Sequence, residues 1–139
     1  MNKNIHASCI CVKQKGVLFL GDSGSGKSDL CLRLIMEFGA KLVADDRVDI
    51  KIEKKTIIAS APKILKGLLE VRGVGIIKLP AKAKAKIDIV VSLVGNKDEI
   101  ERFPEREFLE FGSVKVSKIS LFAKEASAPA KVLAALTML

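Results

Sequence analysis

Aromatic side chains are scarce in this chain of 139 residues, which has six phenylalanines, no tryptophan and no tyrosine. Single-stranded nucleic acids bind by stacking bases on aromatic side chains, so this composition argues against a nucleic-acid partner. Long apolar runs are also lacking: the run at 89–94 contains a serine and is far shorter than the roughly 20 residues that span a bilayer. Residues 1–6 lack the apolar stretch of a signal peptide. We therefore expect a cytoplasmic protein with no membrane partner.

Potential metal ligands are few, with one histidine and three cysteines. Cys9 and Cys11 are too close in sequence to form a sensible disulfide, and Cys31 falls in a predicted helix. A metal site of His6, Cys9 and Cys11 is conceivable, but it has neither a fourth ligand nor the spacing of zinc motifs. Reduced, mostly buried thiols are the simpler interpretation, and they are typical of a reducing compartment.

Acidic residues are relatively few: the chain has 16, against 24 basic residues, and its net charge is +8. This balance favours anionic partners such as nucleotides, phosphoproteins or acidic protein surfaces. Lys82, Lys84 and Lys86 alternate with alanine in the segment 80–86. The alternation predicts a solvated edge or a mobile loop, and a docking patch for an acidic partner is the alternative interpretation.

Hydrophobic periodicity and turn residues predict a single α/β domain over residues 1–139, with more strands than helices. Only one strand–loop–helix unit is clear, which favours a mixed sheet with few helices over a doubly wound fold. Strands are predicted at 6–12, 17–20, 41–44, 48–52, 56–59, 76–79 and 87–94, with one or two more within 113–122. Helices are predicted at 28–38, 62–69 and 126–139, and a glycine-containing loop at 70–75.

The segment GDSGSGKS at 21–28 matches the pattern G-x-x-x-x-G-K-[ST] in full. Its glycines let backbone N–H groups surround phosphate oxygens, and the helix that follows adds the positive end of its dipole. Lys27 can reach the β- and γ-phosphates, and the Ser28 hydroxyl can ligate Mg²⁺. The predicted phosphate-binding residues are Gly21, Asp22, Ser23, Gly24, Ser25, Gly26, Lys27 and Ser28.

Phosphoryl transfer also needs an acidic element and a group that orients the nucleophile. Asp45 and Asp46 follow a short apolar strand, and ligand-binding residues gather at the carboxyl ends of strands in α/β sheets. Two adjacent carboxylates near a phosphate are costly unless one meets a metal and the other a proton. The alternative interpretation is a solvated turn.

Three further residues are weaker candidates. Glu70 and Arg72 flank a compact turn that contains Gly73, so they can serve as a metal ligand and a phosphate ligand, or form only an exposed ion pair. His6 by itself is typical of a surface or packing residue. If its strand pairs beside the strand that precedes the phosphate loop, His6 can point at the γ-phosphate.

The segments GDSGSGKSDL, LVADDRVDI and LLEVRGVGIIKL resemble, in order and spacing, the catalytic domain of HPr kinase/phosphorylase. This bacterial enzyme family phosphorylates a serine of the phosphocarrier protein HPr and removes the phosphate again, in regulation of the phosphotransferase system. The resemblance covers residues 6–79. It implies a nucleotide-binding core like that of phosphoenolpyruvate carboxykinase, the cofactors ATP and Mg²⁺, and HPr or a close relative as substrate. Inorganic phosphate and pyrophosphate would take part if phosphorylase activity is retained.

The resemblance also implies roles for catalytic residues. It makes Asp46 the general base that accepts the proton of the substrate serine, with Asp45 supporting it. Lys27 would hold phosphate, and His6 and Arg102 would lie near the transferring phosphoryl group. The chain resembles a short form of the family that lacks the N-terminal domain.

Metal binding and assembly follow from the same resemblance. Ser28 and Glu70 would hold Mg²⁺, and Arg72 with Gly73 would shape the signature loop. The family forms hexamers, so we expect a homo-oligomer. A small-molecule P-loop kinase would need a lid with several arginines, which the chain lacks. A nucleotide-binding regulator without catalysis is the main alternative.

Overall fold

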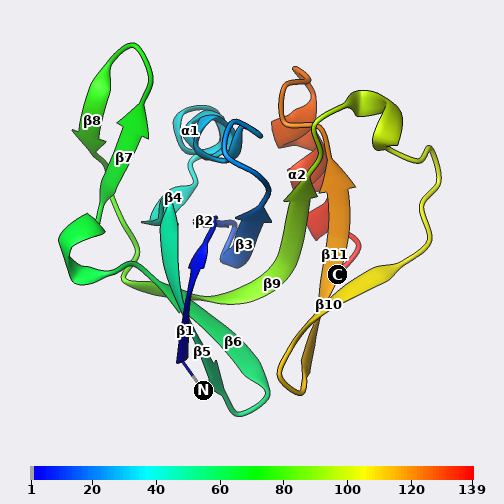
Figure 1. Cartoon of the computed structure of the whole chain (residues 1–139), viewed down its shortest axis with the longest axis horizontal. Coiled ribbons are helices and arrows are strands. Elements are labelled where there is room, and N and C mark those ends of the chain that lie inside the picture. Colours follow the sequence, from blue (N-terminus) through cyan, green and yellow to red (C-terminus); the bar gives the residue numbers. More distant parts are fainter. Residues whose placement is uncertain (1) are drawn as a thin grey trace.

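A nine-stranded mixed sheet organises the computed structural model, which describes residues 2–139 (Figure 1). Its central path runs β1-β5-β6-β9-β3-β2-β4, and β11 pairs with β9 and carries β10. The strands of this sheet are β1 (Asn2–His6), β2 (Ser8–Val12), β3 (Lys15–Leu20), β4 (Lys41–Ala44), β5 (Arg47–Glu53), β6 (Thr56–Ser60), β9 (Lys84–Leu93), β10 (Glu107–Phe111) and β11 (Val114–Leu121). A separate two-stranded sheet is formed by β7 (Leu68–Val71) and β8 (Gly75–Lys78).

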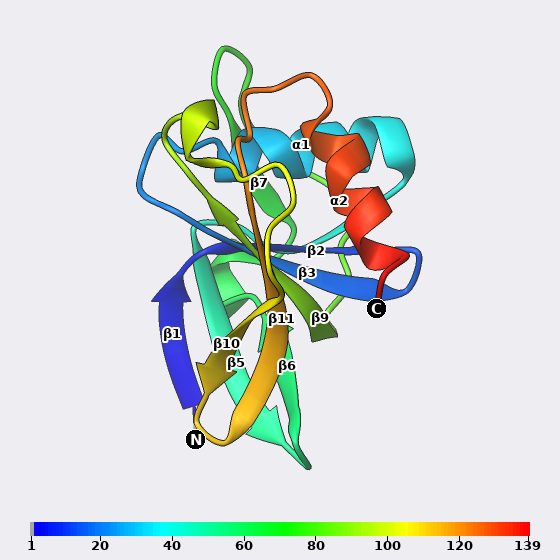
Figure 2. The same ribbon diagram turned by 90° about the vertical axis from the view of Figure 1, so that its right-hand side faces the viewer.

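The helices within the described residues are α1 (Lys27–Phe38) and α2 (Ala128–Leu136), with two short 3₁₀ turns at Lys63–Leu65 and Lys97–Glu99. Both α-helices cover the same face of the central strands, whereas β1, β5, β6 and β10 extend from the opposite side (Figure 2). This arrangement confirms the predicted α/β fold with a mixed sheet and few helices. No helix within residues 2–139 combines the length and the hydropathy needed to cross a bilayer.

The ten-residue strand β9 joins the two halves of the sheet. Its first residues pair with β6 in antiparallel fashion, and its later residues pair in parallel with both β3 and β11. Three parallel strands therefore end at one edge of the sheet, which is where ligands bind in α/β folds.

Alternating side chains of the central strands fill two cores. On β3, Val17 and Phe19 pack toward α1 and α2, while Leu18 points into the opposite core. On β2, Ile10 faces the helices, and Cys9 and Cys11 face away from them. Burial on both faces explains why these strands read as continuous apolar runs. All three cysteines are free and buried, as predicted.

The structure corrects the prediction of one strand over 6–12. The segment is divided at Ala7 into β1 and β2, because the two strands have different partners. β1 pairs with β5, whereas β2 pairs with β3 and β4. The Ala7 N–H donates to the Asp46 carbonyl at 3.2 Å, so this break is fastened to the acidic turn.

The predicted helix at 62–69 is wrong, and the loop predicted at 70–75 is shorter, because only residues 72–74 lie between two strands. Only Lys63–Leu65 form a 3₁₀ turn, and β7 begins at Leu68. The strand pairing Glu70↔Ile76 makes the glycine-containing segment a hairpin turn between β7 and β8. Leu69 is fully buried in the core beneath α1, and this burial together with the hairpin pairing overrides the helical pattern.

Two other segments differ in detail. Lys84, Ala85 and Lys86 belong to β9 and pair with β6, so half of the alanine–lysine segment is strand, although its lysines are exposed as expected for a solvated edge. The predicted range 113–122 holds one strand, β11, and its hairpin partner β10 lies before that range, at Glu107–Phe111, where no strand was predicted. The C-terminal helix occupies 128–136 of the predicted 126–139.

Candidate active site

The phosphate loop connects the end of β3 to the first residue of α1. Gly26 precedes the helix with a φ of 97°, and the Leu30 N–H donates to its carbonyl at 2.9 Å. Within the loop, the Ser25 N–H donates to the Asp22 carbonyl at 3.0 Å. The strand, loop and helix predicted around residues 21–28 are therefore present in that order, with the helix N-terminus directed at the loop.

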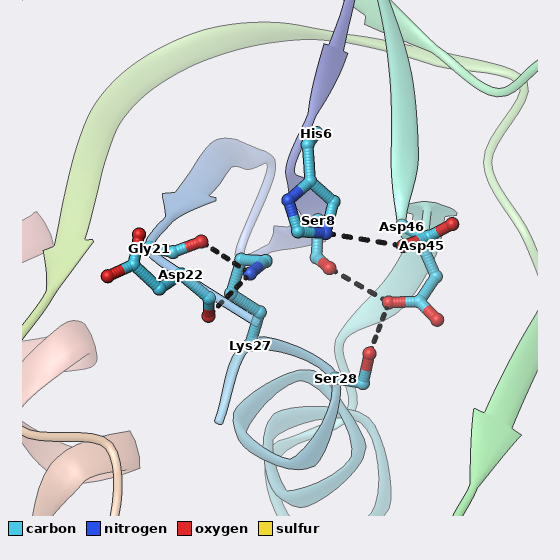
Figure 3. Close-up of polar contacts among 8 residues, drawn as sticks. All are labelled: His6, Ser8, Gly21, Asp22, Lys27, Ser28, Asp45 and Asp46. Carbon is cyan, nitrogen blue, oxygen red and sulfur yellow. Dashed lines mark hydrogen bonds and ion pairs between the residues drawn. The ribbon is translucent and has the colours of Figure 1, made fainter. Parts of the chain in front are cut away.

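Lys27 is 7 % exposed and folds back over this loop. Its Nζ donates to the carbonyls of Gly21 at 2.6 Å and Asp22 at 3.2 Å (Figure 3). Burial lowers the pKa of Lys27, and the nearby carboxylates of Asp45, Asp46 and Asp22 oppose this shift. The ammonium is thus held at the loop, where it can bind an anion.

Ser25 supplies an independent sign that the loop accepts a ligand. Its Oγ is buried and has no hydrogen-bond partner within residues 2–139. A Cβ built on Gly21 would lie 2.6 Å from this oxygen, so the Ser25 side chain occupies the space that a side chain at position 21 would need. Buried hydroxyls without a partner are costly, and a phosphate oxygen would satisfy the Ser25 hydroxyl.

Asp45 is the polar centre of the site. Although its side chain is buried, its Oδ1 accepts hydrogen bonds from Ser28 Oγ at 2.6 Å and from Ser8 Oγ at 2.8 Å (Figure 3). The carboxylate therefore ties α1 and β2 to the end of β4. Ser8 was not predicted, although a serine within an otherwise apolar strand is a signal that could have singled it out.

The donor set at Ser28 fits Mg²⁺, which prefers oxygen ligands and keeps several waters or phosphate oxygens in its shell. Because the Ser28 proton is directed at Asp45, the lone pairs of the Ser28 oxygen remain available to a cation. No cluster of three or more carboxylate, histidine or cysteine side chains suited to a metal occurs within residues 2–139. A metal here would therefore be held jointly by protein and phosphates.

Asp46 differs from its neighbour in being exposed. Its carboxylate Oδ1 lies 3.3 Å from His6 Nε2, and the side chains of Asp46 and His6 are 70 % and 39 % exposed (Figure 3). The φ of Asp46 is 68°, a left-handed conformation that Asp tolerates better than most residues. The turn thus points Asp45 inward and Asp46 outward, which resolves how two adjacent carboxylates share one site.

The remaining predicted residues are not brought into this cluster. Glu70 is exposed on β7, and Arg72 and Gly73 are exposed in the β7–β8 turn. Arg102 stacks its guanidinium over the neighbouring Phe103 ring, with 5.5 Å between the guanidinium carbon and the ring centroid. None of the four makes a hydrogen bond or ion pair with the site residues described above.

The sequence profile of the HPr Serine kinase C-terminal domain matches residues 1–138. This chain belongs to that family. An HPr kinase/phosphorylase from Caldicellulosiruptor bescii is 38 % identical over 122 residues, which cover 80 % of this chain and 39 % of the relative. One from Lactobacillus johnsonii is 49 % identical over 76 residues, which cover 54 % of this chain and 24 % of the relative. The chain thus spans well under half the length of these members of the HPr kinase family.

A solved structure of the Hpr(Ser) kinase/phosphatase from Coxiella burnetii is also similar. It superposes with a TM-score of 0.83 at 27 % sequence identity, and the match covers 98 % of this chain and 95 % of the other. The HPr kinase fold predicted from the three quoted segments is therefore confirmed along nearly the whole chain, including the region after residue 79 where the sequence resemblance was weak.

Proposed function

We propose that this chain transfers the γ-phosphate of ATP to a serine of a phosphocarrier protein, HPr or a close relative, as a regulator of the phosphotransferase system. One observation carries the proposal: the exposed Asp46 carboxylate, paired with His6, stands beside a complete phosphate loop. Membership of the HPr kinase family supports the same activity.

The phosphate loop would hold ATP. Backbone N–H groups of 22–28 and the ammonium of Lys27 bind the β- and γ-phosphates, and the Ser25 hydroxyl gains a partner among the phosphate oxygens. Lys27 already lies over the loop, where it contacts the Gly21 and Asp22 carbonyls. When ATP binds, its ammonium would therefore give up only part of these contacts to reach the phosphates. Positioning and charge neutralisation supply most of the catalysis in phosphoryl transfer.

Asp46 would act as the general base. The serine oxygen of the substrate forms a bond to the γ-phosphorus as the bond from phosphorus to the bridging oxygen of ADP breaks. The serine proton passes to Asp46, whose exposed carboxylate can approach a hydroxyl on another protein. His6 orients this carboxylate through the contact at 3.3 Å.

Ser28, which is hydrogen-bonded to Asp45, would hold Mg²⁺ together with the phosphates, and Glu70 of β7, a strand that packs against α1, would be the further ligand. When bound, the ion neutralises charge on the phosphate oxygens. Ser8 keeps the Asp45 carboxylate in one orientation. Arg72 and Gly73 shape the hairpin that carries Glu70.

Arg102 would neutralise charge on the transferring phosphoryl group. Arg102 stacks on Phe103 and makes no hydrogen bond or ion pair with the site residues described above, so that role would require either a movement of its segment or an arginine supplied by a neighbouring copy. A homo-oligomer, hexameric by resemblance to the family, would allow the second route. The net charge of +8 suits docking of an acidic carrier protein.

The reverse reaction uses the same groups. An oxygen of inorganic phosphate attacks the phosphorus of phosphoserine, the bond to the serine oxygen breaks, and pyrophosphate forms. Asp46, protonated in the forward direction, returns the proton to the serine oxygen, as microscopic reversibility requires.

Mass spectrometry of HPr tests the proposal. The purified chain is incubated with Mg²⁺-ATP and the HPr of its own organism, and we expect one phosphate on a serine. Addition of inorganic phosphate should then remove it and release pyrophosphate. ATP binding without any transfer to HPr would instead support a nucleotide-binding regulator.

A further inference from the structure

Two loops other than the phosphate loop leave the sheet at the same edge. β3, β9 and β11 are parallel, and the pairings Leu20↔Ser92 and Leu121↔Leu93 align their carboxyl ends. The segments 94–99 and 122–127 therefore begin beside the phosphate loop, as the cartoon also shows (Figure 1). Neither segment has a role in the site described above.

The end of β9 and the loop after β11 both lie close to the phosphate loop. A Cβ on Gly21 would lie 3.0 Å from the Leu93 carbonyl oxygen, and a Cβ on Gly26 would lie 2.9 Å from the Ala123 Cβ. The Val94 N–H donates to the Leu121 carbonyl at 3.0 Å, which joins the starts of the two loops. The first glycine of the phosphate loop thus lies against the last residue of β9, and its last glycine lies against the loop that follows β11.

Arg33 of α1 holds the second loop in place. It donates to the carbonyls of Glu125, at 3.0 Å, and of Ala123, and its Nε lies 3.1 Å from Asp29. The Glu125 side chain pairs with Lys131 of α2 at 2.5 Å. The loop after β11 is therefore a preformed surface, which lowers the entropic cost of binding a ligand.

The position of the acceptor site fixes the direction of the nucleotide. In the sheet order β4-β2-β3-β9-β11, Asp45 and Asp46 follow β4, on one side of β3. The γ-phosphate must face that side to meet the serine acceptor. The nucleoside then extends from the phosphate loop toward the other side, where the loops after β9 and β11 lie.

We propose that these two loops bind the adenine base, with Phe122 against the ring and Asn96 reading its edge; this inference rests on the proposed function. Phe122 is half-buried and Asn96 is exposed. The Asn96 Oδ1 accepts from the Asp98 N–H at 2.9 Å, which leaves Nδ2 to donate to N7 and a second lone pair for the adenine amino group. Asn pairs with adenine through N6 and N7, whereas guanine presents an acceptor in place of the amino group.

The variant Asn96→Asp tests this assignment without removing the cap of the short helix. Aspartate is an equally good N-cap and still accepts from the Asp98 N–H, but it replaces the Nδ2 donor with an acceptor. We expect affinity for Mg²⁺-ATP to fall about tenfold and affinity for Mg²⁺-tripolyphosphate to stay unchanged. Asn2→Asp, which adds the same charge on β1, is the matched control and should alter neither affinity.

Phe122→Leu provides a second test, because it keeps apolar packing but removes the aromatic ring. It should weaken ATP several-fold and leave tripolyphosphate unaffected. Equal affinity of the native chain for ATP and tripolyphosphate, or ATP binding untouched by both variants, would overturn the base site while leaving the phosphate site intact. Failure of the native chain to bind either compound would overturn the proposed function as well.

Discussion

The Ser8 hydroxyl donates to the Asp45 carboxylate at 2.8 Å across a sequence separation of 37 residues, on the same oxygen that Ser28 reaches at 2.6 Å. Two hydroxyls from β2 and α1 thus fix one buried carboxylate. The adjacent Asp46 remains exposed beside His6. Asp45 is therefore buried and held by two hydroxyls, whereas Asp46 is exposed, and the predictions for Ser8 and Asp46 below rest on this difference.

Ser8→Ala should impair catalysis more than folding. The variant loses one hydrogen bond to Asp45, but Ser28 still satisfies that carboxylate, so we expect a loss of about 1 kcal/mol in the free energy of unfolding. We expect kcat to fall several-fold with little change in KM for ATP, because the carboxylate loses its fixed orientation. Chemical denaturation and steady-state kinetics measure these effects, with Ser117→Ala on β11 as control. A kcat equal to that of the native chain would show that Ser8 does not orient the site.

The affinity for ATP should depend on the protonation of Lys27. Burial lowers its pKa, so in the free protein Lys27 loses its proton at a lower pH than an ordinary lysine does. Because phosphate binding needs the charged form, affinity should begin to decline as pH rises, before exposed lysines titrate near about pH 10.4. Calorimetric titrations across this range measure the decline. The variant Lys27→Arg keeps a positive charge at every pH in this range. We therefore expect it to bind ATP more weakly than the native chain, with an affinity that does not change with pH. An equal decline of affinity in this variant would assign the pH effect to another group.

Gly26→Ala should disable the phosphate loop, and Gly24→Ala should be tolerated better. Both residues have positive φ, 97° and 83°, which costs an alanine about 1–2 kcal/mol. Only at Gly26 would the new Cβ also collide, 2.9 Å from the Ala123 Cβ, whereas nothing lies within 4 Å at Gly24. We expect a larger drop in melting temperature and a greater loss of ATP affinity for Gly26→Ala. Equal effects of the two substitutions would contradict the close approach of the two loops.

The parts of the site whose positions were predicted correctly are determined by local sequence. The phosphate loop is a continuous motif between an apolar strand and an amphipathic helix, so its conformation depends on neighbours in sequence. The pair Asp45 and Asp46 likewise follows directly from the end of a short strand. These features need no knowledge of the strand order.

Long-range pairing determines the parts that could not be predicted. Ser8 reaches Asp45 only because β2 lies between β3 and β4. The structure has the strand β7 where a helix was predicted, because Leu69 is buried under α1 and β7 pairs with β8. The periodicity of apolar residues cannot reveal either of these long-range contacts. The break at Ala7 depends on β1 joining β5 rather than continuing along β3.

Single-turnover transfer from Mg²⁺-ATP to HPr by Asp46→Asn, measured beside ATP affinity, tests the central claim most directly. Asparagine also tolerates the left-handed φ of 68°, so the turn and the Asp45 hydrogen bonds should persist. We predict that transfer falls by at least about 100-fold, the usual contribution of a general base, while ATP affinity stays within a factor of about 2. Asp49→Asn on β5, the matched control, should transfer phosphate at the native rate. Transfer by Asp46→Asn at more than a few per cent of the native rate would contradict the assignment of Asp46 as the base.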